Sequence, residues 1–115
     1  MVWARRGKYN ARKQVASDGT KCASGKERRR YEQLLLMRKN GIIKDLRVQV
    51  PYELIPSQRD KDGKAVRSVV YVADFVYKTA DGAEVVEDAK GMRTPVYLIK
   101  RKLMLFVHGI TIKEV

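Results

Sequence analysis

The sequence is short of the side chains that build zinc sites, disulfides and the commonest nucleophilic active sites. It has one cysteine, Cys22, and one histidine, His108, among 115 residues. A single cysteine cannot close an internal disulfide, which fits a reducing, cytoplasmic setting. One Cys and one His also supply too few ligands for a zinc site and no Ser/His/Asp or Cys/His catalytic set. Any chemistry of this chain is therefore expected from other side chains.

Long apolar runs are also missing. No stretch approaches the ~20 apolar residues that span a bilayer, and the first residues, MVWARRGKYNARK, lack the apolar core of a signal peptide. With 44% hydrophobic and 33% charged residues, the chain suits one globular domain. We therefore expect a cytoplasmic protein without a membrane partner.

Acidic residues are scarce outside the middle of the chain. Residues 1–50 hold 14 Lys and Arg against 4 Asp and Glu, residues 91–115 hold 5 against 1, and residues 51–90 hold 6 against 8. The net charge of +12 favours a polyanionic partner, and nucleic acid is the commonest polyanion in a cytoplasm. A basic structural or ribosome-associated RNA-binding protein is an alternative that the charge also allows.

Two helices are predicted from their start and stop signals. Ser24 followed three residues later by Glu27 is a capping box, and it starts a helix that ends at Asn40-Gly41. The second helix covers residues 94–109, with Thr94 as the N-cap, a proline in the first position and a glycine at the end.

Strands are predicted over residues 46–54, 68–78, 84–90 and 110–115, with a loop or hairpin tip over 56–67. Residues 1–23 have little apolar periodicity and are expected to form a basic, partly flexible arm, with a turn at SDGT. Residues 24–115 are expected to form the domain. The order of elements predicts an α/β fold, a single small domain with a mixed sheet flanked by helices.

Two acids interrupt strands that are otherwise apolar. Asp74 lies in YVADFVY, where a buried carboxylate is costly unless it is paired or binds a cation. Asp88 and Lys90 share one face of EVVEDAK, and Glu87 points the other way, toward solvent or a helix. A hairpin around Asp81-Gly82 brings Asp74 opposite Asp88 only if the turn is longer than two residues or the strand contains a bulge.

Two carboxylates and a lysine at this spacing suit phosphodiester hydrolysis. Mg²⁺ binds through one or two carboxylates and retains several waters, and a bound metal lowers the pKa of water and screens phosphate charge. Lys90 could orient or deprotonate that water, or stabilise the developing negative charge. An exposed ion pair across the sheet is the alternative for Asp88 and Lys90.

The set Asp74 … Asp88-Ala89-Lys90 resembles the Asp…(Asp/Glu)-x-Lys pattern of the PD-(D/E)XK nuclease superfamily. SGKERRRYEQLL resembles the helix start that precedes this pattern in many members. Residues 8–115 look like a small phage-associated family described as Holliday-junction-resolvase-like. The resemblance implies a restriction-endonuclease-like core and a metal-dependent endonuclease of recombination, cutting branched DNA or Holliday junctions in the cytoplasm of a bacterial host. A homodimer is expected, since two strands must be cut.

The resemblance also implies individual roles. Glu27, Asp74 and Asp88 would be catalytic acids that hold one or two Mg²⁺ ions, with Mn²⁺ as a substitute, and Lys90 would be the catalytic lysine. Gln49 would assist from the preceding strand. For Glu27 the capping box is an alternative reason to be present.

Basic side chains around this site would hold the phosphate backbone, which gives affinity and little sequence reading. Three successive cations on the second helix spread over most of a turn, so they cannot all face one phosphate. A solvated helix face is the alternative. The predicted nucleic-acid contacts are Arg28, Arg29, Arg30, Arg93, Lys100, Arg101 and Lys102. The alternative function is a nucleic-acid-binding protein that kept the fold and lost the reaction.

Overall fold

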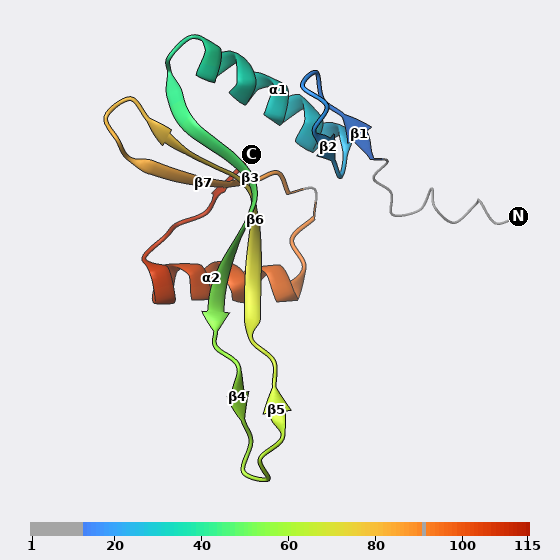
Figure 1. Cartoon of the computed structure of the whole chain (residues 1–115), viewed down its shortest axis with the longest axis vertical. Coiled ribbons are helices and arrows are strands. Elements are labelled where there is room, and N and C mark those ends of the chain that lie inside the picture. The colour runs from blue at the N-terminus through green and yellow to red at the C-terminus, as the bar shows by residue number, and fades with distance from the viewer. Residues whose placement is uncertain (1–12, 91) are drawn as a thin grey trace, which may run out of the picture.

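The computed structural model describes residues 13–90 and 92–115 (Figure 1). Its helices are α1 (Gly25–Lys39) and α2 (Pro95–His108). Its strands are β1 (Gln14–Val15), β2 (Lys21–Cys22), β3 (Ile43–Ile55), β4 (Gln58–Arg59), β5 (Ala65–Val66), β6 (Val69–Thr79), β7 (Glu84–Asp88) and β8 (Lys113–Glu114). The main sheet has the order β3-β6-β7-β8, with β8 parallel to β7 and the other neighbours antiparallel. This mixed sheet with two helices confirms the predicted small α/β fold.

Both helices start at the predicted caps. The Ser24 hydroxyl accepts the Glu27 N–H at 3.1 Å, and the Thr94 hydroxyl accepts the Tyr97 N–H at 3.1 Å. The helix α2 ends at Gly109, whose φ of 67° is a left-handed conformation that glycine adopts without steric cost. Local capping chemistry therefore determines where these helices begin and end.

Residues 13–23, expected to belong to the arm, instead form a hairpin that packs on α1. The strand β1 pairs with β2, and Ala16 and Cys22 are buried in one cluster with Tyr31 of α1. The Tyr31 hydroxyl donates to Asp18 in the hairpin turn at 2.6 Å. Two-residue strands are too short for apolar alternation to be visible in a sequence. Residues 1–12 of the expected arm lie outside the described residues.

Three hairpins turn through the same local geometry. Each has an Asp-Gly pair in a three-residue loop, and Gly19, Gly63 and Gly82 have φ of 90°, 82° and 90°. In the turn between β6 and β7, the Thr79 N–H donates to the Ala83 carbonyl at 2.9 Å. This loop is one residue longer than a two-residue turn, which is the condition under which the sequence predicts that Asp74 faces Asp88. Phe75 pairs with Glu87, and continuing this register places Asp74 opposite Asp88.

Halfway along the paired strands β3 and β6, the alternation of side chains between the two faces of the sheet reverses. Val50 pairs with Ala73, and both pack in the cluster that contains Met104 of α2. Val48 and Phe75, two residues further along, pack instead in the cluster that contains Leu34 of α1. Residues two apart in a regular strand share one face, so the alternation reverses between these pairs.

The reversal falls at Gln49, whose φ of 52° is left-handed, and at Asp74 across from it. As a result α1 lies beside one half of the strand pair and α2 beside the other half (Figure 1). The point of reversal lies between the two core clusters, and this is where the polar side chains of the candidate site gather.

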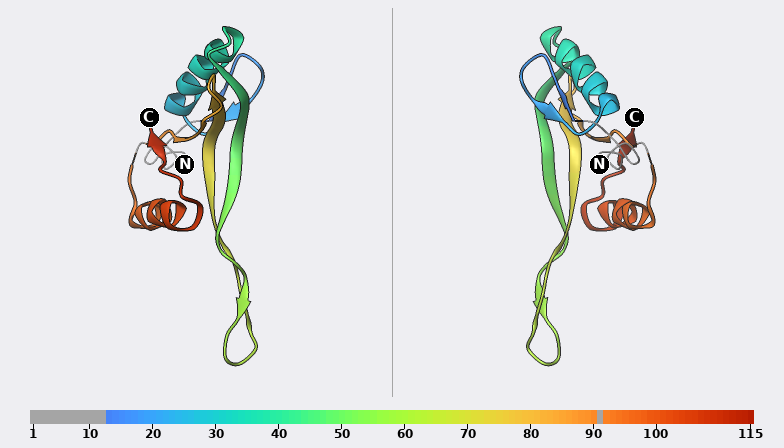
Figure 2. Two further views of the ribbon diagram at one scale, coloured as in Figure 1. Left: turned by 90° about the vertical axis from the view of Figure 1, so that its left-hand side faces the viewer. Right: turned by 90° about the vertical axis from the view of Figure 1, so that its right-hand side faces the viewer.

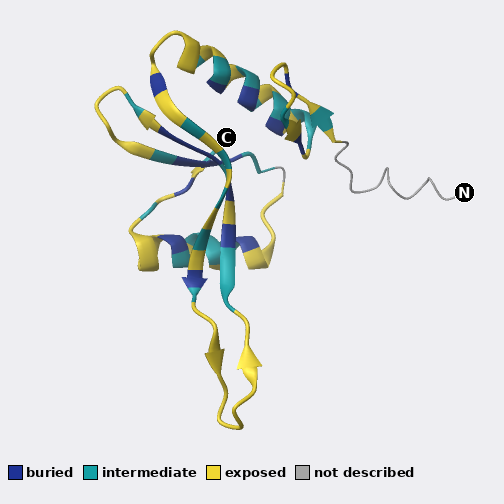
Figure 3. Ribbon diagram, in the orientation of Figure 1, coloured by how far each residue is buried: buried dark blue, intermediate teal, exposed yellow. Residues whose placement is uncertain are grey.

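Beyond the sheet, β3 and β6 continue as a narrow ribbon. The strand β4 pairs with β5, and every residue from 56 to 67 is exposed (Figure 3). In both side views the ribbon extends beyond α2, away from both helices (Figure 2). The predicted loop or hairpin tip over residues 56–67 is thus a β-hairpin.

The left-handed backbone at Gln49 predicts an unusual order of stability among variants. Gln49→Val should unfold more easily than Gln49→Gly, by about 1–2 kcal/mol, because a β-branched residue is strained at positive φ. Urea unfolding followed by circular dichroism measures this difference. At Glu53, an exposed residue of the same strand without positive φ, the order should invert, because valine suits a strand better than glycine. The same order at both positions would contradict the strained backbone.

Candidate active site

Asp74 is held at the point where the strand alternation reverses. Its Oδ1 accepts from the Gln49 side-chain amide at 3.3 Å, and its Oδ2 accepts from the Ala89 backbone N–H at 2.8 Å. Burial raises the pKa of Asp74, the Ala89 hydrogen bond opposes the shift, and the nearby charge of Asp88 adds to it. A carboxylate whose ionised form is disfavoured in this way is stabilised by a bound cation.

Asp88 is the more buried of the two aspartates, with 2% of its surface exposed. Its Oδ2 accepts from the Tyr71 hydroxyl at 2.5 Å. Its Oδ1 is buried and has no hydrogen-bond partner within the described residues, although it lies 3.4 Å from the Lys90 ammonium. Buried carboxylate oxygens are rarely left without a partner, so Asp88 Oδ1 is available to a further ligand.

Lys90 is fixed beside these acids from two directions. Its Nζ lies 4.4 Å from the centroid of the Tyr97 ring, in cation–π geometry. Its backbone carbonyl accepts from the Lys26 ammonium of α1 at 2.9 Å. Lys90 therefore presents a positioned positive charge to Asp88 rather than a mobile one.

A cavity of about 330 Å³ opens beside Asp74, Asp88 and Lys90. The start of α2 forms part of its lining, and from this helix Lys100 donates to the Val70 carbonyl at 2.9 Å. The N-terminus of α2 adds the positive end of its dipole, since Thr94 also lines the cavity. The cavity thus combines two carboxylates, which attract a cation, with two ammonium groups and a helix N-terminus, which attract an anion.

Glu27 lies next to this cavity, at the start of α1, and is not part of its lining. Only 7% of Glu27 is exposed, and its backbone N–H is bound to Ser24. Burial raises the pKa of Glu27, and the charges of Asp74 and Asp88 add to the shift against a backbone hydrogen bond from Ala23. The capping role is therefore present, and the glutamate also feels both aspartates.

The structure brings Asp74, Asp88 and Lys90 together as the sequence predicts. It does not complete a three-carboxylate ligand set with Glu27: among residues 13–90 and 92–115, no three His, Cys, Asp or Glu side chains form a group arranged to hold a metal ion. Any metal at the cavity would be held by the two aspartates, with water as the remaining ligands.

Arg30, a predicted nucleic-acid contact, is instead paired inside the fold. Its guanidinium donates to both oxygens of Glu87, at 2.8 and 2.6 Å, and the Tyr77 hydroxyl also donates to Glu87. Glu87 is fully buried, so it faces the helix, which is one of the two orientations expected for it. The pair joins α1 to β7 directly behind Asp88.

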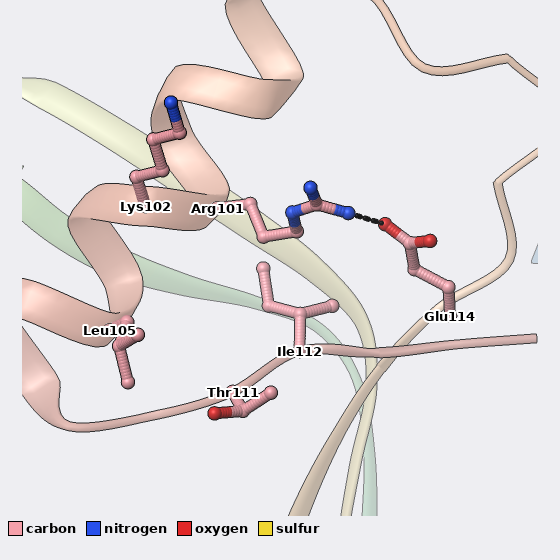
Figure 4. Close-up of a pocket in the computed structure, with 6 residues that line it drawn as sticks. All are labelled: Arg101, Lys102, Leu105, Thr111, Ile112 and Glu114. Carbon is pink, nitrogen blue, oxygen red and sulfur yellow. Dashed lines mark hydrogen bonds and ion pairs between the residues drawn. The ribbon is translucent and has the colours of Figure 1, made fainter.

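The predicted nucleic-acid contacts on α2 and just before it lie in three environments. Lys100 lines the cavity beside Asp74 and Asp88. Arg93 and Arg101 both donate to Glu114 on β8, Arg101 at 2.8 Å. Together with the Tyr97 hydroxyl, the largest contributor, they lower the pKa of Glu114 to about 2. Figure 4 shows Arg101 directed at Glu114 and Lys102 directed away from it, and all three residues line a second cavity of about 260 Å³. The three successive cations on α2 therefore point in different directions, which is the spread over the helix turn that the sequence predicts.

Of the remaining predicted contacts, Arg28 is half-buried and Arg29 is exposed. Sequence reasoning did not identify Tyr71, Tyr97 or Lys26 as part of the site. A sequence signal did exist for the tyrosines, because a buried tyrosine in an apolar strand or helix face needs a hydrogen-bond partner, and acids were the available acceptors. Lys26 carries no such signal, since its contact is to a backbone carbonyl far along the chain.

The family described as "Protein of unknown function (DUF1064)" matches residues 6–109, and the chain belongs to this family. No curated protein and no solved structure matches the chain. No helix in the described part of the chain is long and apolar enough to cross a membrane.

The burial of Glu87 predicts a large stability effect at Arg30. Arg30→Ala should lower the free energy of unfolding by about 3 kcal/mol, because it leaves a buried carboxylate without its cation. Arg29→Ala, one position along the same helix and exposed, should cost less than about 0.5 kcal/mol. Urea unfolding compares them, and the double variant Arg30→Ala, Glu87→Gln should recover part of the loss. Equal losses at Arg29 and Arg30 would contradict the structural role of the pair.

The raised pKa of Asp74 predicts a pH dependence with a definite sign. Well below pH 3.8 the Asp74 carboxyl is protonated in both the folded and the unfolded state. The difference in free energy of unfolding between wild type and Asp74→Asn should therefore not change with pH in that range. As pH rises from 3.8 through the raised native pKa, the folded state binds more protons than the unfolded state. The free energy of unfolding of wild type, measured relative to that of Asp74→Asn, should therefore fall over this pH range. It should keep the reduced value up to neutral pH.

Asp81 should show the opposite dependence of stability on pH and serves as the control for Asp74. The hydrogen bond from the Thr79 hydroxyl lowers the pKa of Asp81, so its ionised form stabilises the fold above pH 3.8 and that stabilisation is lost as pH falls through the native pKa. Asp81→Asn should therefore be less stable than wild type at neutral pH. Denaturant unfolding at several pH values tests both signs, and curves for Asp74→Asn that run parallel to wild type would refute the first.

Proposed function

We propose that this protein is a metal-dependent DNA endonuclease that hydrolyses phosphodiester bonds, with branched DNA such as four-way junctions as its preferred substrate. The observation that carries the proposal is the buried Asp88 Oδ1, which has no hydrogen-bond partner among the described residues and lies beside Asp74 and Lys90 in one cavity. A buried carboxylate oxygen in a purely structural site usually accepts a hydrogen bond, whereas this oxygen is paired at 3.4 Å with the Lys90 ammonium.

The donor set fits Mg²⁺. Asp74 and Asp88 would hold the ion, consistent with its habit of binding through one or two carboxylates and keeping several waters, and Mn²⁺ accepts the same hard oxygen donors. When bound, the ion would activate water and screen the phosphate. Glu27 would reach this centre only through water, in keeping with its place outside the cavity lining.

The protein's own groups supply the remaining functions. Tyr71 fixes the orientation of Asp88 through its hydroxyl. Lys90, held between Asp88 and Tyr97, orients the attacking water or stabilises negative charge on the phosphate oxygens. Lys100 and the N-terminus of α2 bind the same phosphate group from the lining of the cavity.

The strongly basic chain supports a nucleic-acid substrate, since phosphate contacts dominate the affinity for DNA. Arg29 and Lys102 are exposed and available to the backbone of DNA. Cutting two strands of a branched substrate requires two sites, so a homodimer with one site per subunit is part of the proposal.

A second candidate is a nucleic-acid-binding protein on the same fold without catalysis. The observation that favours it is the lack of a three-ligand metal group among residues 13–90 and 92–115. Two carboxylates alone bind Mg²⁺ weakly, and such a site could persist for structural reasons.

Cleavage and metal binding separate the two candidates. Wild type should cut a labelled four-way junction in Mg²⁺ or Mn²⁺ and not in EDTA, whereas Asp88→Asn and Lys90→Ala should lose at least about 10²-fold in rate. In thermal unfolding, Mg²⁺ at tenfold its dissociation constant should stabilise wild type by about 1.4 kcal/mol. Asp88→Asn should lose this stabilisation.

The matched control is Glu84→Gln, an exposed acid on the same strand, which should keep both cleavage and Mg²⁺ stabilisation. Binding to junctions and linear duplex without cleavage in either metal would reject the nuclease and leave the binding protein. Flap and linear duplex substrates in the same assay rank the structural preference.

A further inference from the structure

The ribbon formed by residues 56–67 contributes no residue to either core cluster. All of its residues are exposed (Figure 3), and it extends beyond α2, away from both helices (Figure 2). Exposed strand edges are a liability that proteins usually cover or shorten. A rigid extension of this kind is therefore expected to serve binding rather than stability.

The tip of the ribbon is organised before any partner is present. Asp60 Oδ1 accepts the backbone N–H groups of Asp62 and Lys64, both at 2.9 Å. Arg59 donates across the ribbon to the Gly63 carbonyl at 3.1 Å, and Gly63 takes the left-handed conformation that the turn needs. The carboxylate of Asp60 is occupied within the turn, so it competes little with an incoming anion.

The surface of the ribbon is basic and nearly without apolar side chains. Its four cations, Arg59, Lys61, Lys64 and Arg67, outnumber its two acids, Asp60 and Asp62, and none of the cations is ion-paired within the described part of the chain. Val66 is the one large apolar side chain in residues 57–67. Protein–protein interfaces are depleted of lysine and rich in apolar and aromatic residues at their centres. The composition favours a polyanion over a protein partner.

The ribbon begins at the wall of the candidate active site. Val70, Tyr71 and Val72 line the cavity, and Arg67 lies three residues before them in the chain. Lys61, nine residues from Val70, lies up to about 30 Å away along an extended strand, which approaches the ~34 Å of one turn of duplex DNA. A two-stranded ribbon also fits the major groove, which is about 12 Å wide.

We infer that the β4–β5 ribbon is a DNA-binding arm that lies in a groove of duplex DNA within about one helical turn of the bond at the cavity. Its lysines and arginines contact phosphates on either side of that groove, which positions the duplex without reading its sequence. The inference rests on the proposed function only in taking DNA as the partner, and it does not require cleavage.

The test compares two triple variants that remove the same charge from opposite ends of the molecule. The ribbon variant is Lys61→Ala, Lys64→Ala, Arg67→Ala. The control variant is Arg38→Ala, Lys39→Ala, Lys44→Ala, three exposed cations at the far end of α1 and the start of β3 (Figure 1). Binding to a fluorescent duplex of 30 base pairs is measured by anisotropy in EDTA over a range of salt concentrations, after circular dichroism melting confirms that both variants fold.

The ribbon variant should bind at least about tenfold more weakly at 0.1 M salt, and its slope of log affinity against log salt should be smaller by about 2 to 3. The control variant should stay within about threefold of wild type. Equal weakening by both triples would mean that net charge alone attracts DNA, and would overturn the inference. Wild-type affinity in the ribbon variant would also overturn it, even if cleavage is normal.

A protein partner gives a different result. If the ribbon clasps a second copy, the ribbon variant should change the sedimentation velocity of the free protein and leave DNA affinity unchanged, which would overturn the DNA-binding arm. The proposed nuclease is judged separately, by cleavage in metal. Wild type that binds DNA through the ribbon without cutting it would reject the nuclease while supporting the arm.

Discussion

The pairing of Gln49 with Asp74 determines how the rest of the molecule is arranged. Because side-chain alternation reverses at this pair, one continuous strand pair serves two separate core clusters, one under each helix. The same reversal places a carboxylate at the boundary between the clusters, where neither supplies it with a full apolar cover. A strand pair with unbroken alternation would put both helices on one face or leave one cluster uncovered, and the cavity beside Asp74 and Asp88 would not form.

Around this point the fold separates the acids that stabilise it from those available for chemistry. Glu87 and Glu114 are each surrounded by an arginine and a tyrosine hydroxyl, so their charges are balanced within the protein. Asp74 and Asp88 receive hydrogen bonds from an amide, a backbone N–H and a hydroxyl, and Lys90 is paired with Asp88. Among the described residues neither aspartate is paired with an arginine, and the proposed metal site is placed on these two acids for that reason.

The sequence predicts the parts of this arrangement that depend on neighbouring residues. Capping by Ser24 and Thr94 follows from local hydrogen bonding, and the Asp-Gly pairs indicate the turns. Counting residues around one of those turns leaves Asp74 and Asp88 one position out of register for a two-residue turn, and the three-residue loop in the structure brings them opposite each other. These features need no knowledge of distant contacts.

Contacts between distant residues were not predictable in the same way. Arg30 and Glu87 are separated by 57 positions, and nothing local distinguishes an arginine that pairs inside from one that faces DNA. Glutamine is not among the residues that favour positive φ, so the reversal at Gln49 has no signature in the sequence. The hairpin of residues 13–23 rests on two buried residues, Ala16 and Cys22, which is too little apolar pattern to detect.

The strand β8 lies at the end of the described chain, yet it is attached directly to the candidate site. The Val115 N–H donates to the Asp88 carbonyl at 3.0 Å, and Glu114 is bound by Tyr97, whose ring lies beside the Lys90 ammonium. A substitution in β8 can therefore shift the backbone of Asp88 without contacting its carboxylate.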